Sequence, residues 1–241
     1  MFLSIEGSTN YLSLAISKKN LIVCNKTLYI ENNLPEIIIP SIHNLFKDNS
    51  ISINELSTVA VGCGPGSFTG IRAVIATAKG ILNSNYNLQS FGVNGLATLT
   101  MSVLKEAIQY NIKYIISMID TKRADNFIQL FKVNYKENNS FPFYPLNEIE
   151  ALDLKNINDY LIKNKLEDKS ILFVGHRSSE IKSNIITSKI SKNIFQKPDA
   201  IWIAKLASYL TNKLENKNYT SFIFKELEPI YIRTAEINNY V

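Results

Sequence analysis

Four glycines stand close together in the stretch GCGPGSFTG, at residues 62, 64, 66 and 70. The apolar residues before this stretch predict the end of a buried strand, and the periodicity after it predicts a helix over residues 69–82. Backbone N–H groups at a helix N-terminus bind anions, so Gly64, Gly66 and Ser67 are candidate ligands for an anion or a nucleotide. The loop matches neither a P-loop nor the strict dinucleotide fingerprint, and a tight strand-to-helix connection is the alternative interpretation.

Two acidic residues, Glu6 and Asp120, end predicted buried strands. A carboxylate at such a position is costly unless it is paired or has a function. If one topology occurs twice in the chain, these acids occupy equivalent places and face each other across a cleft, where they are candidates for holding magnesium and a nucleotide. A local ion pair between Asp120 and Arg123 is the simpler alternative.

Residues for metal or nucleophilic chemistry are sparse in this chain. The two histidines, His43 and His176, are far apart, and so are the two cysteines, Cys24 and Cys63. A zinc site needs three or four ligands, and a hydrolytic triad needs a histidine with recognisable partners. The sequence therefore predicts no metal site and no catalytic residues. His43 is expected at a surface or boundary, and His176 as a local hydrogen-bonding group.

The composition is that of an ordinary globular protein. The 241 residues are 46% hydrophobic and 20% charged, with a formal net charge of +5. This charge permits a nucleic-acid partner, but the lysines are scattered, which disfavours strong direct RNA binding. No apolar run approaches the roughly 18 residues of a membrane span, and the opening stretch MFLSIEGST lacks the basic region of a signal peptide. We therefore predict a reduced, cytoplasmic protein with no membrane contact.

Hydrophobic periodicity predicts an α/β fold in which one topology, βββαβαβα, is duplicated. The order in the first half, three antiparallel strands followed by alternating helices and strands, is typical of ribonuclease-H-like domains. The predicted strands cover residues 2–6, 11–18, 21–29, a segment ending at 61, and 88–93. The predicted helices cover residues 35–49, 69–82 and a segment that runs from a cap at 94 to about 104. Pro40 falls inside the first helix and predicts either a kink or a later start.

A similar order begins again at residue 113. Strands are predicted over residues 113–120, 126–133, 141–146 and 171–175, and helices over 153–163 and from a cap at Asp199 to Leu214. Two prolines within 141–146 place that strand at an edge. We expect two lobes, residues 1–106 and 107–241, with a hinge near residues 105–111 and a C-terminal tail that can pack back on the first lobe.

The predicted helix after the glycine loop carries two stripes. Its large apolar residues recur at spacings of three and four, and beside them runs a stripe of small residues, Ala73, Ala76, Thr77 and Gly80. Small side chains allow two helices to approach closely. Because both stripes cannot easily face one sheet, the small stripe is predicted to contact a helix of a partner. Packing of this stripe on the protein's own sheet is the alternative.

Several short motifs resemble those of the bacterial TsaB (YeaZ) family. They are GPGSFTGIR at residues 64–72, GVNGLA at 92–97, IDTKR at 119–123 and PIYIR at 229–233, and they follow the family's order over nearly the whole chain. The string at 64–72 is far more specific than an isolated glycine triplet.

This resemblance implies a two-lobed actin/Hsp70-like fold and a non-catalytic role in making threonylcarbamoyladenosine beside the tRNA anticodon. Members of the family pair with the catalytic TsaD subunit through helices of the first lobe, are joined by the TsaE ATPase, and reach tRNA through that complex. We place the partner interface at Ser67, Phe68, Thr69 and Arg72 together with the small stripe. Pairing of two copies of the isolated chain through this helix face is an alternative that the sequence leaves open, and no cofactor is implied beyond weak or shared nucleotide binding.

Two segments depart from the family pattern. The family's opening Asp-Thr-Ser/Thr turn is replaced by EGST at residues 6–9, and its Arg-x-Gly-Glu-Val-Tyr segment by RADNFI at 123–128. The first departure argues against a working nucleotide and metal site at Glu6, and the second against a role for the missing acid and tyrosine. The alternative to a scaffold is a stand-alone ATP-binding enzyme of the actin/sugar-kinase class, with Glu6 and Asp120 as magnesium acids.

Overall fold

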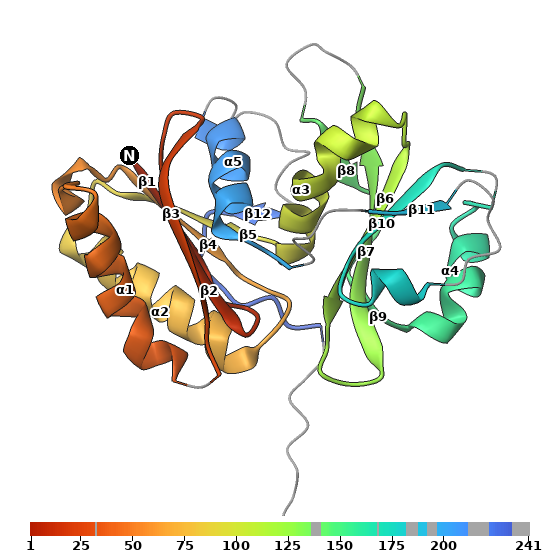
Figure 1. Cartoon of the computed structure of the whole chain (residues 1–241), viewed down its shortest axis with the longest axis horizontal. Helices are drawn as coiled ribbons and strands as arrows, with labels where there is room; N and C mark the ends of the chain where they lie inside the picture. The colour runs from red at the N-terminus through yellow and green to blue at the C-terminus, as the bar shows by residue number, and fades with distance from the viewer. Residues whose placement is uncertain are drawn as a thin grey trace, which may run out of the picture.

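The computed structural model describes residues 1–31, 33–135, 141–167, 169–181, 188–191, 197–211 and 222–232. These residues form two mixed β-sheets with helices packed on their faces, and the two sheets lie in two lobes side by side (Figure 1). No helix within these ranges has the length and apolar character that crossing a membrane requires.

The first half of the chain follows the predicted order of elements closely. Its elements are β1 (Phe2–Glu6), β2 (Tyr11–Lys18), β3 (Leu21–Tyr29), α1 (Leu34–Asp48), β4 (Thr58–Gly62), α2 (Phe68–Ser84), β5 (Gln89–Val93) and α3 (Gly95–Gln109), with a short 3-10 turn at Ile53–Glu55. The prediction that Pro40 marks a later start of α1 is wrong, because the helix begins with Leu34 and Pro35 in its first turn. Proline is favoured there since its missing N–H has no helical partner to lose.

The second half follows a similar order. Its elements are β6 (Tyr114–Asp120), β7 (Asp125–Val133), β8 (Phe143–Pro145), β9 (Glu150–Asp153), α4 (Ile157–Lys163), β10 (Ile171–Gly175), β11 (Ser188–Ile190), α5 (Ala200–Thr211) and β12 (Ile223–Phe224), with 3-10 turns at Leu154–Asn156 and Ser178–Glu180. The helix predicted over 153–163 is therefore divided into a 3-10 turn and α4. Compared with the first half, this half has an additional strand, β9, and a 3-10 turn as the described element between β10 and β11. The predicted continuation of α5 to Leu214 lies outside the described residues.

The two sheets share one strand order, which confirms the duplicated topology. The order β5-β4-β1-β2-β3 in the first sheet corresponds to β11-β10-β6-β7-β8 in the second. β1 is parallel to β4 and antiparallel to β2, just as β6 is parallel to β10 and antiparallel to β7. β8 lies at the edge of its sheet, as its prolines predict. Glu6 and Asp120 therefore end corresponding strands.

Side-chain caps fix where the helices begin. The Ser67 hydroxyl accepts a hydrogen bond from the Gly70 N–H at 3.3 Å, so Ser67 rather than Thr69 is the cap of α2. Asn94 caps α3 by accepting from the Leu96 N–H at 2.8 Å. Asp199 accepts from the N–H of Ile201 at 2.9 Å and begins α5, as predicted.

Three hydrophobic cores hold the layers together. The first lies between the first sheet and the helices α1 and α2, where Ile71 and Val74 of α2 are buried. The second lies between the two sheets and contains Leu96 of α3 and Ile203 of α5 (Figure 1). The third lies between the second sheet and α4. Because α3 and α5 share one core, buried apolar surface joins the two lobes.

The C-terminal elements return to the first lobe. Helix α5 packs against β1, β2 and β4, and β12 pairs antiparallel with β5 at the edge of the first sheet. Helix α3 continues across residues 106 and 107, where the two predicted domains meet. The division into residues 1–106 and 107–241 stays a prediction.

Two glycines of α2 allow a matched test of this packing. A Cβ built on Gly70 overlaps the carbonyl oxygen of Gly7, whereas a Cβ built on Gly80 meets no atom within 4 Å. We expect Gly70→Ala to lower the free energy of unfolding by about 1–3 kcal/mol through overpacking. Gly80→Ala should raise it by up to about 1 kcal/mol through helix propensity. Urea unfolding measures both, and equal effects of the two substitutions would contradict this packing.

Candidate functional site

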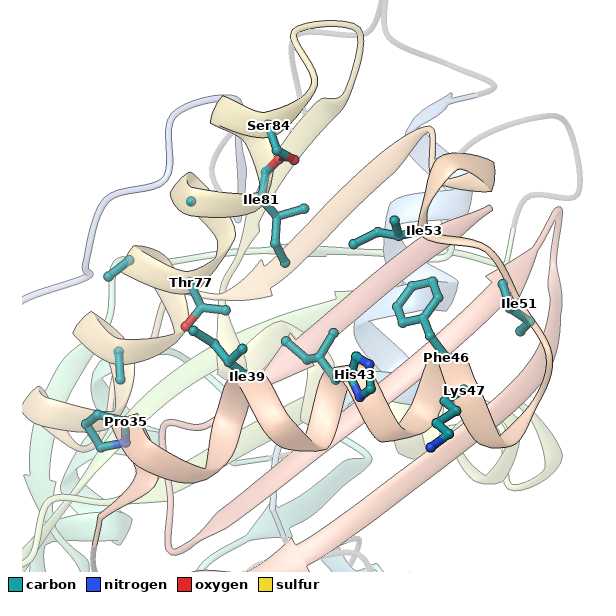
Figure 2. Close-up of a pocket in the computed structure, with 14 residues that line it drawn as sticks. Pro35, Ile39, His43, Phe46, Lys47, Ile51, Ile53, Thr77, Ile81 and Ser84 are labelled. Atoms are coloured by element: carbon teal, nitrogen blue, oxygen red, sulfur yellow. Dashed lines mark hydrogen bonds between the residues drawn. The ribbon is translucent and has the colours of Figure 1, made fainter.

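An open apolar groove lies between α1 and α2. The two helices pack side by side over the first core and leave a groove of about 830 Å³ open to solvent between them. Figure 2 shows Ile39 of α1 and Thr77 and Ile81 of α2 turned toward this space. We call it the α1–α2 groove. Its lining residues are Pro35, Ile39, Ile42, His43, Phe46, Lys47, Ile51, Ile53, Ala73, Ala76, Thr77, Gly80, Ile81 and Ser84.

The small stripe of α2 lies on this open side of the helix. Ala76 and Gly80 are exposed, and Ala73 and Thr77 are half-buried. The large apolar residues of the same helix are buried against the first sheet. The two stripes therefore occupy different faces. That the small stripe contacts a partner helix stays a prediction.

Large apolar side chains on α1 and the segment after it complete the groove. Ile39 is 63% exposed and Ile53 is 51% exposed. His43 and Lys47 also line the groove, and no acidic residue does. A contiguous apolar surface of this kind on a globular protein typically marks a site of interaction with another macromolecule.

The α1 side of the groove was not identified from the sequence. The buried residues of α1 follow the helical period, but Ile39 falls outside that pattern and points outward. An isoleucine on the solvent face of an amphipathic helix was the available signal. His43, expected at a surface or boundary, is exposed and lies in the groove.

A second, smaller pocket of about 270 Å³ lies where the strand ends of both lobes meet. Asp120 lines it, and its carboxylate lies 3.3 Å from the Lys122 amine and 3.7 Å from Nε2 of His176. The same carboxylate accepts a hydrogen bond from the Lys122 N–H at 2.8 Å. Lys197 also lines this pocket, with its amine over the ring of Tyr11. Asp120 thus has Lys122 as a cationic partner and His176 as a neighbour within its own lobe, and its pairing with Arg123 stays a prediction.

Glu6 lies in very different surroundings from Asp120. Its side chain is 1% exposed, and one carboxylate oxygen accepts a hydrogen bond from the Ser8 N–H at 2.6 Å. The other oxygen has no hydrogen-bond partner among the residues that the structure describes. Burial raises the pKa of this carboxyl group above its ordinary value, which favours the neutral acid. Magnesium prefers ionised carboxylates, so this environment does not favour Glu6 as a metal ligand.

The glycine loop packs against the turn that follows β1. The Ser67 N–H donates a hydrogen bond to the Ser8 carbonyl at 2.7 Å, and the Gly95 N–H donates one to the Gly64 carbonyl at 2.8 Å. A Cβ on Gly66 would overlap the Ser8 carbonyl oxygen. These close approaches give the glycines a structural role. Such a role agrees with the alternative interpretation of the loop as a tight strand-to-helix connection. Anion binding by Gly64, Gly66 and Ser67 stays a prediction.

Metal ligands are not clustered in the described part of the chain. No group of three His, Cys, Asp or Glu residues there is placed to hold a metal ion. Cys63 is buried, and burial raises the pKa of its thiol to about 12. A thiol in this state is not ionised near neutral pH and is inert as a nucleophile.

Comparison with known proteins identifies the family that the chain resembles. A family model described as TsaD, tRNA N6-adenosine threonylcarbamoyltransferase, matches residues 30–139. The tRNA threonylcarbamoyladenosine biosynthesis protein TsaB of Buchnera aphidicola subsp. Baizongia pistaciae is 27% identical over 233 residues, which cover 95% of this chain and 96% of that protein. The Bacillus subtilis protein of the same name is also 27% identical, over 73% of this chain and 71% of its own length. The chain is similar to proteins of the TsaB (YeaZ) family over nearly its whole length.

A solved structure of the TsaB (YeaZ) family has the same fold. YeaZ from Pseudomonas aeruginosa superposes with a TM-score of 0.69 at 15% identity, covering 95% of this chain and 98% of that one. The two-lobed actin-like fold expected from the sequence is thereby confirmed. The segment that matches the TsaD model includes both helices of the α1–α2 groove.

The buried Glu6 carboxyl predicts a specific pH dependence of stability. Because its pKa in the folded chain is raised above 4.5, its contribution to stability is fully present at low pH and is lost as pH rises through the folded pKa. The wild-type chain should therefore lose stability relative to Glu6→Gln as pH increases from about 4.5 toward 8. Denaturant unfolding at several pH values measures this difference.

The exposed residue Glu36 on α1 provides the control for this experiment. Glu36→Gln should leave the pH dependence of unfolding as it is in the wild type. A stability difference between wild type and Glu6→Gln that stays constant across the pH range would show that Glu6 is not held neutral.

Proposed function

We propose that this chain is a non-catalytic subunit in the biosynthesis of tRNA threonylcarbamoyladenosine and pairs with a TsaD-type threonylcarbamoyltransferase through the α1–α2 groove. The observation that carries the proposal is the open apolar groove whose α2 side consists of small residues. We place the complex in the cytoplasm, where a TsaE-type ATPase joins the pair. Transfer RNA is reached through the catalytic partner.

Helix geometry supports this mode of pairing. Ala76 and Gly80 present almost no side chain to solvent, so the backbone of a partner helix can approach α2 closely. Ile39 and Ile53 are exposed beside them. A partner that covers the groove removes the apolar surface of these side chains from water, which favours binding. The TsaD family model matches the segment that contains α1 and α2, so we expect a TsaD-type partner to carry an equivalent helix pair. Two such pairs can pack around a pseudo-twofold axis.

The strand ends support a non-catalytic role. In the pocket between the lobes, Asp120 is already paired with Lys122 and His176. Glu6 is sealed beneath the turn after β1, and burial raises the pKa of its carboxyl group. The two acids that would have to ligate one magnesium ion therefore lie in very different surroundings. We therefore assign the chemistry of threonylcarbamoyl transfer to the TsaD-type partner.

One observation favours a second candidate function. The pocket between the lobes has two lysines, Lys122 and Lys197, beside hydroxyl groups of Ser8 and Ser67, which suits a phosphate-bearing ligand. A stand-alone ATP-binding enzyme of the actin/sugar-kinase class would use this pocket. Calorimetry of the isolated chain with magnesium and ATP separates the two functions. Micromolar binding with turnover would favour the enzyme over the scaffold.

A bulky cation in the middle of the small stripe should abolish pairing. Ala76 is exposed, so Ala76→Arg should leave thermal stability unchanged while it weakens binding of the TsaD-type partner by about 100-fold or more. Surface plasmon resonance or analytical gel filtration with the purified partner measures the affinity.

Ile162 on α4 is the matched control, because it is 57% exposed on a helix of the other lobe. Ile162→Arg should bind the partner with wild-type affinity. Wild-type affinity of Ala76→Arg would overturn the proposed interface. Pairing of two copies of this chain through the same groove would appear as a dimer of the isolated protein that Ala76→Arg also dissociates.

The functional readout is tRNA modification by the reconstituted complex. Omission of this chain, or its replacement by Ala76→Arg, should abolish threonylcarbamoyladenosine formation by the TsaD-type and TsaE-type proteins. Full activity without this chain would contradict its role as a subunit.

A further inference from the structure

An exposed cluster of three side chains lies at the start of α2. The Arg72 guanidinium lies 3.7 Å from the centroid of the Phe68 ring, and its Nε–H donates a hydrogen bond to the Tyr231 hydroxyl at 2.8 Å. The two aromatic rings have their centroids 5.5 Å apart. Phe68 is 46% exposed and Tyr231 is 48% exposed. We call these three residues the arginine cluster.

Tyr231 is brought to α2 by the C-terminal segment that follows β12. This segment is anchored along its length: Leu227 is buried in the first core, and the Ile230 N–H donates to the Cys63 carbonyl at 2.8 Å. The Ser90 hydroxyl donates to the carbonyl of Lys225 at 3.2 Å. The position of Tyr231 is therefore fixed before any partner binds, which lowers the entropy cost of ordering Arg72.

The arginine cluster continues the surface proposed for pairing. Phe68, Arg72, Ala76 and Gly80 are spaced four residues apart, so they form a single row along the helix. The cluster lies at one end of this row and the smallest residues at the other. A partner helix that crosses the small residues can also reach Arg72.

The charge on α2 is entirely positive. Residues 68–84 include Arg72 and Lys79 and no acidic residue. Within the described parts of the chain, neither cation forms an ion pair. An arginine has five N–H donors in a planar fork, and the Tyr231 contact uses only the one on Nε. The remaining donors match a carboxylate in a bidentate geometry.

We propose that the arginine cluster is an anchor that binds a carboxylate side chain on the helix pair of the TsaD-type partner. This inference rests on the proposed function and names the chemistry that selects the partner. The aromatic rings hold the planar guanidinium in place, and the apolar groove supplies the adjoining contact area. Buried arginine and tyrosine side chains dominate binding energy at many interfaces.

The test compares variants of Arg72 and Tyr231 with Ala76→Arg in one binding assay with the purified partner. Arg72→Glu should weaken binding by about 100-fold, because it opposes the carboxylate with a like charge. Arg72→Lys should weaken it by about 10-fold, since an ammonium lacks the planar fork. Tyr231→Phe should weaken it by about threefold to tenfold, because Arg72 loses the hydrogen bond that orients it. Thermal melts establish that each variant is folded.

A charge-swap experiment identifies the carboxylate directly. Each acidic residue on the partner's helix pair is changed to Arg and combined with Arg72→Glu, and one combination should restore binding by at least about tenfold. Failure of every combination would overturn the anchor. Wild-type affinity of Arg72→Glu together with loss of binding by Ala76→Arg would overturn the anchor and leave the proposed function standing. Wild-type affinity of both variants would overturn the proposed function itself.

Discussion

The close approach between the first turn of α2 and the turn that follows β1 determines where α2 lies. Gly70 sits directly on the carbonyl of Gly7, and the Ser67 N–H donates to the Ser8 carbonyl. No larger residue than glycine fits at position 70, so the backbone itself forms the contact. This contact fixes the start of α2 over the ends of β1 and β4. The helix then runs beside α1 with one face on the sheet and the other toward solvent.

The same contact explains why the two candidate sites differ so much in character. The turn that supports α2 also covers Glu6 and excludes water from its carboxyl group. The pocket between the lobes is left with Asp120, whose carboxylate already lies close to the Lys122 amine and the His176 ring. An open apolar groove lies instead on the outer helices of the first lobe. In this chain the geometry favours recognition of another protein over chemistry between the lobes.

Local signals in the sequence predict most of the first lobe. Alternating apolar residues give the bounds of β1, β2 and β3 correctly, and Asn94 and Asp199 identify the starts of two helices because a cap acts on its own neighbours. Contacts between distant segments were not predictable in this way. Tyr231 meets Arg72 across 159 residues of chain, and periodicity carries no information about such a pair. The proposed anchor was therefore visible only in part, through Phe68 and Arg72.

The return of α5 and β12 to the first sheet bears on how the protein is made. Helix α5 covers one face of the first sheet, and β12 extends its edge, although both follow the whole second sheet in the chain. The apolar faces of the N-terminal strands are therefore covered only after residues 200–224 have left the ribosome. Until then a nascent chain of about 200 residues exposes surface that is normally internal, and such surface attracts chaperones. The first lobe is thus completed only after the second sheet has been synthesised.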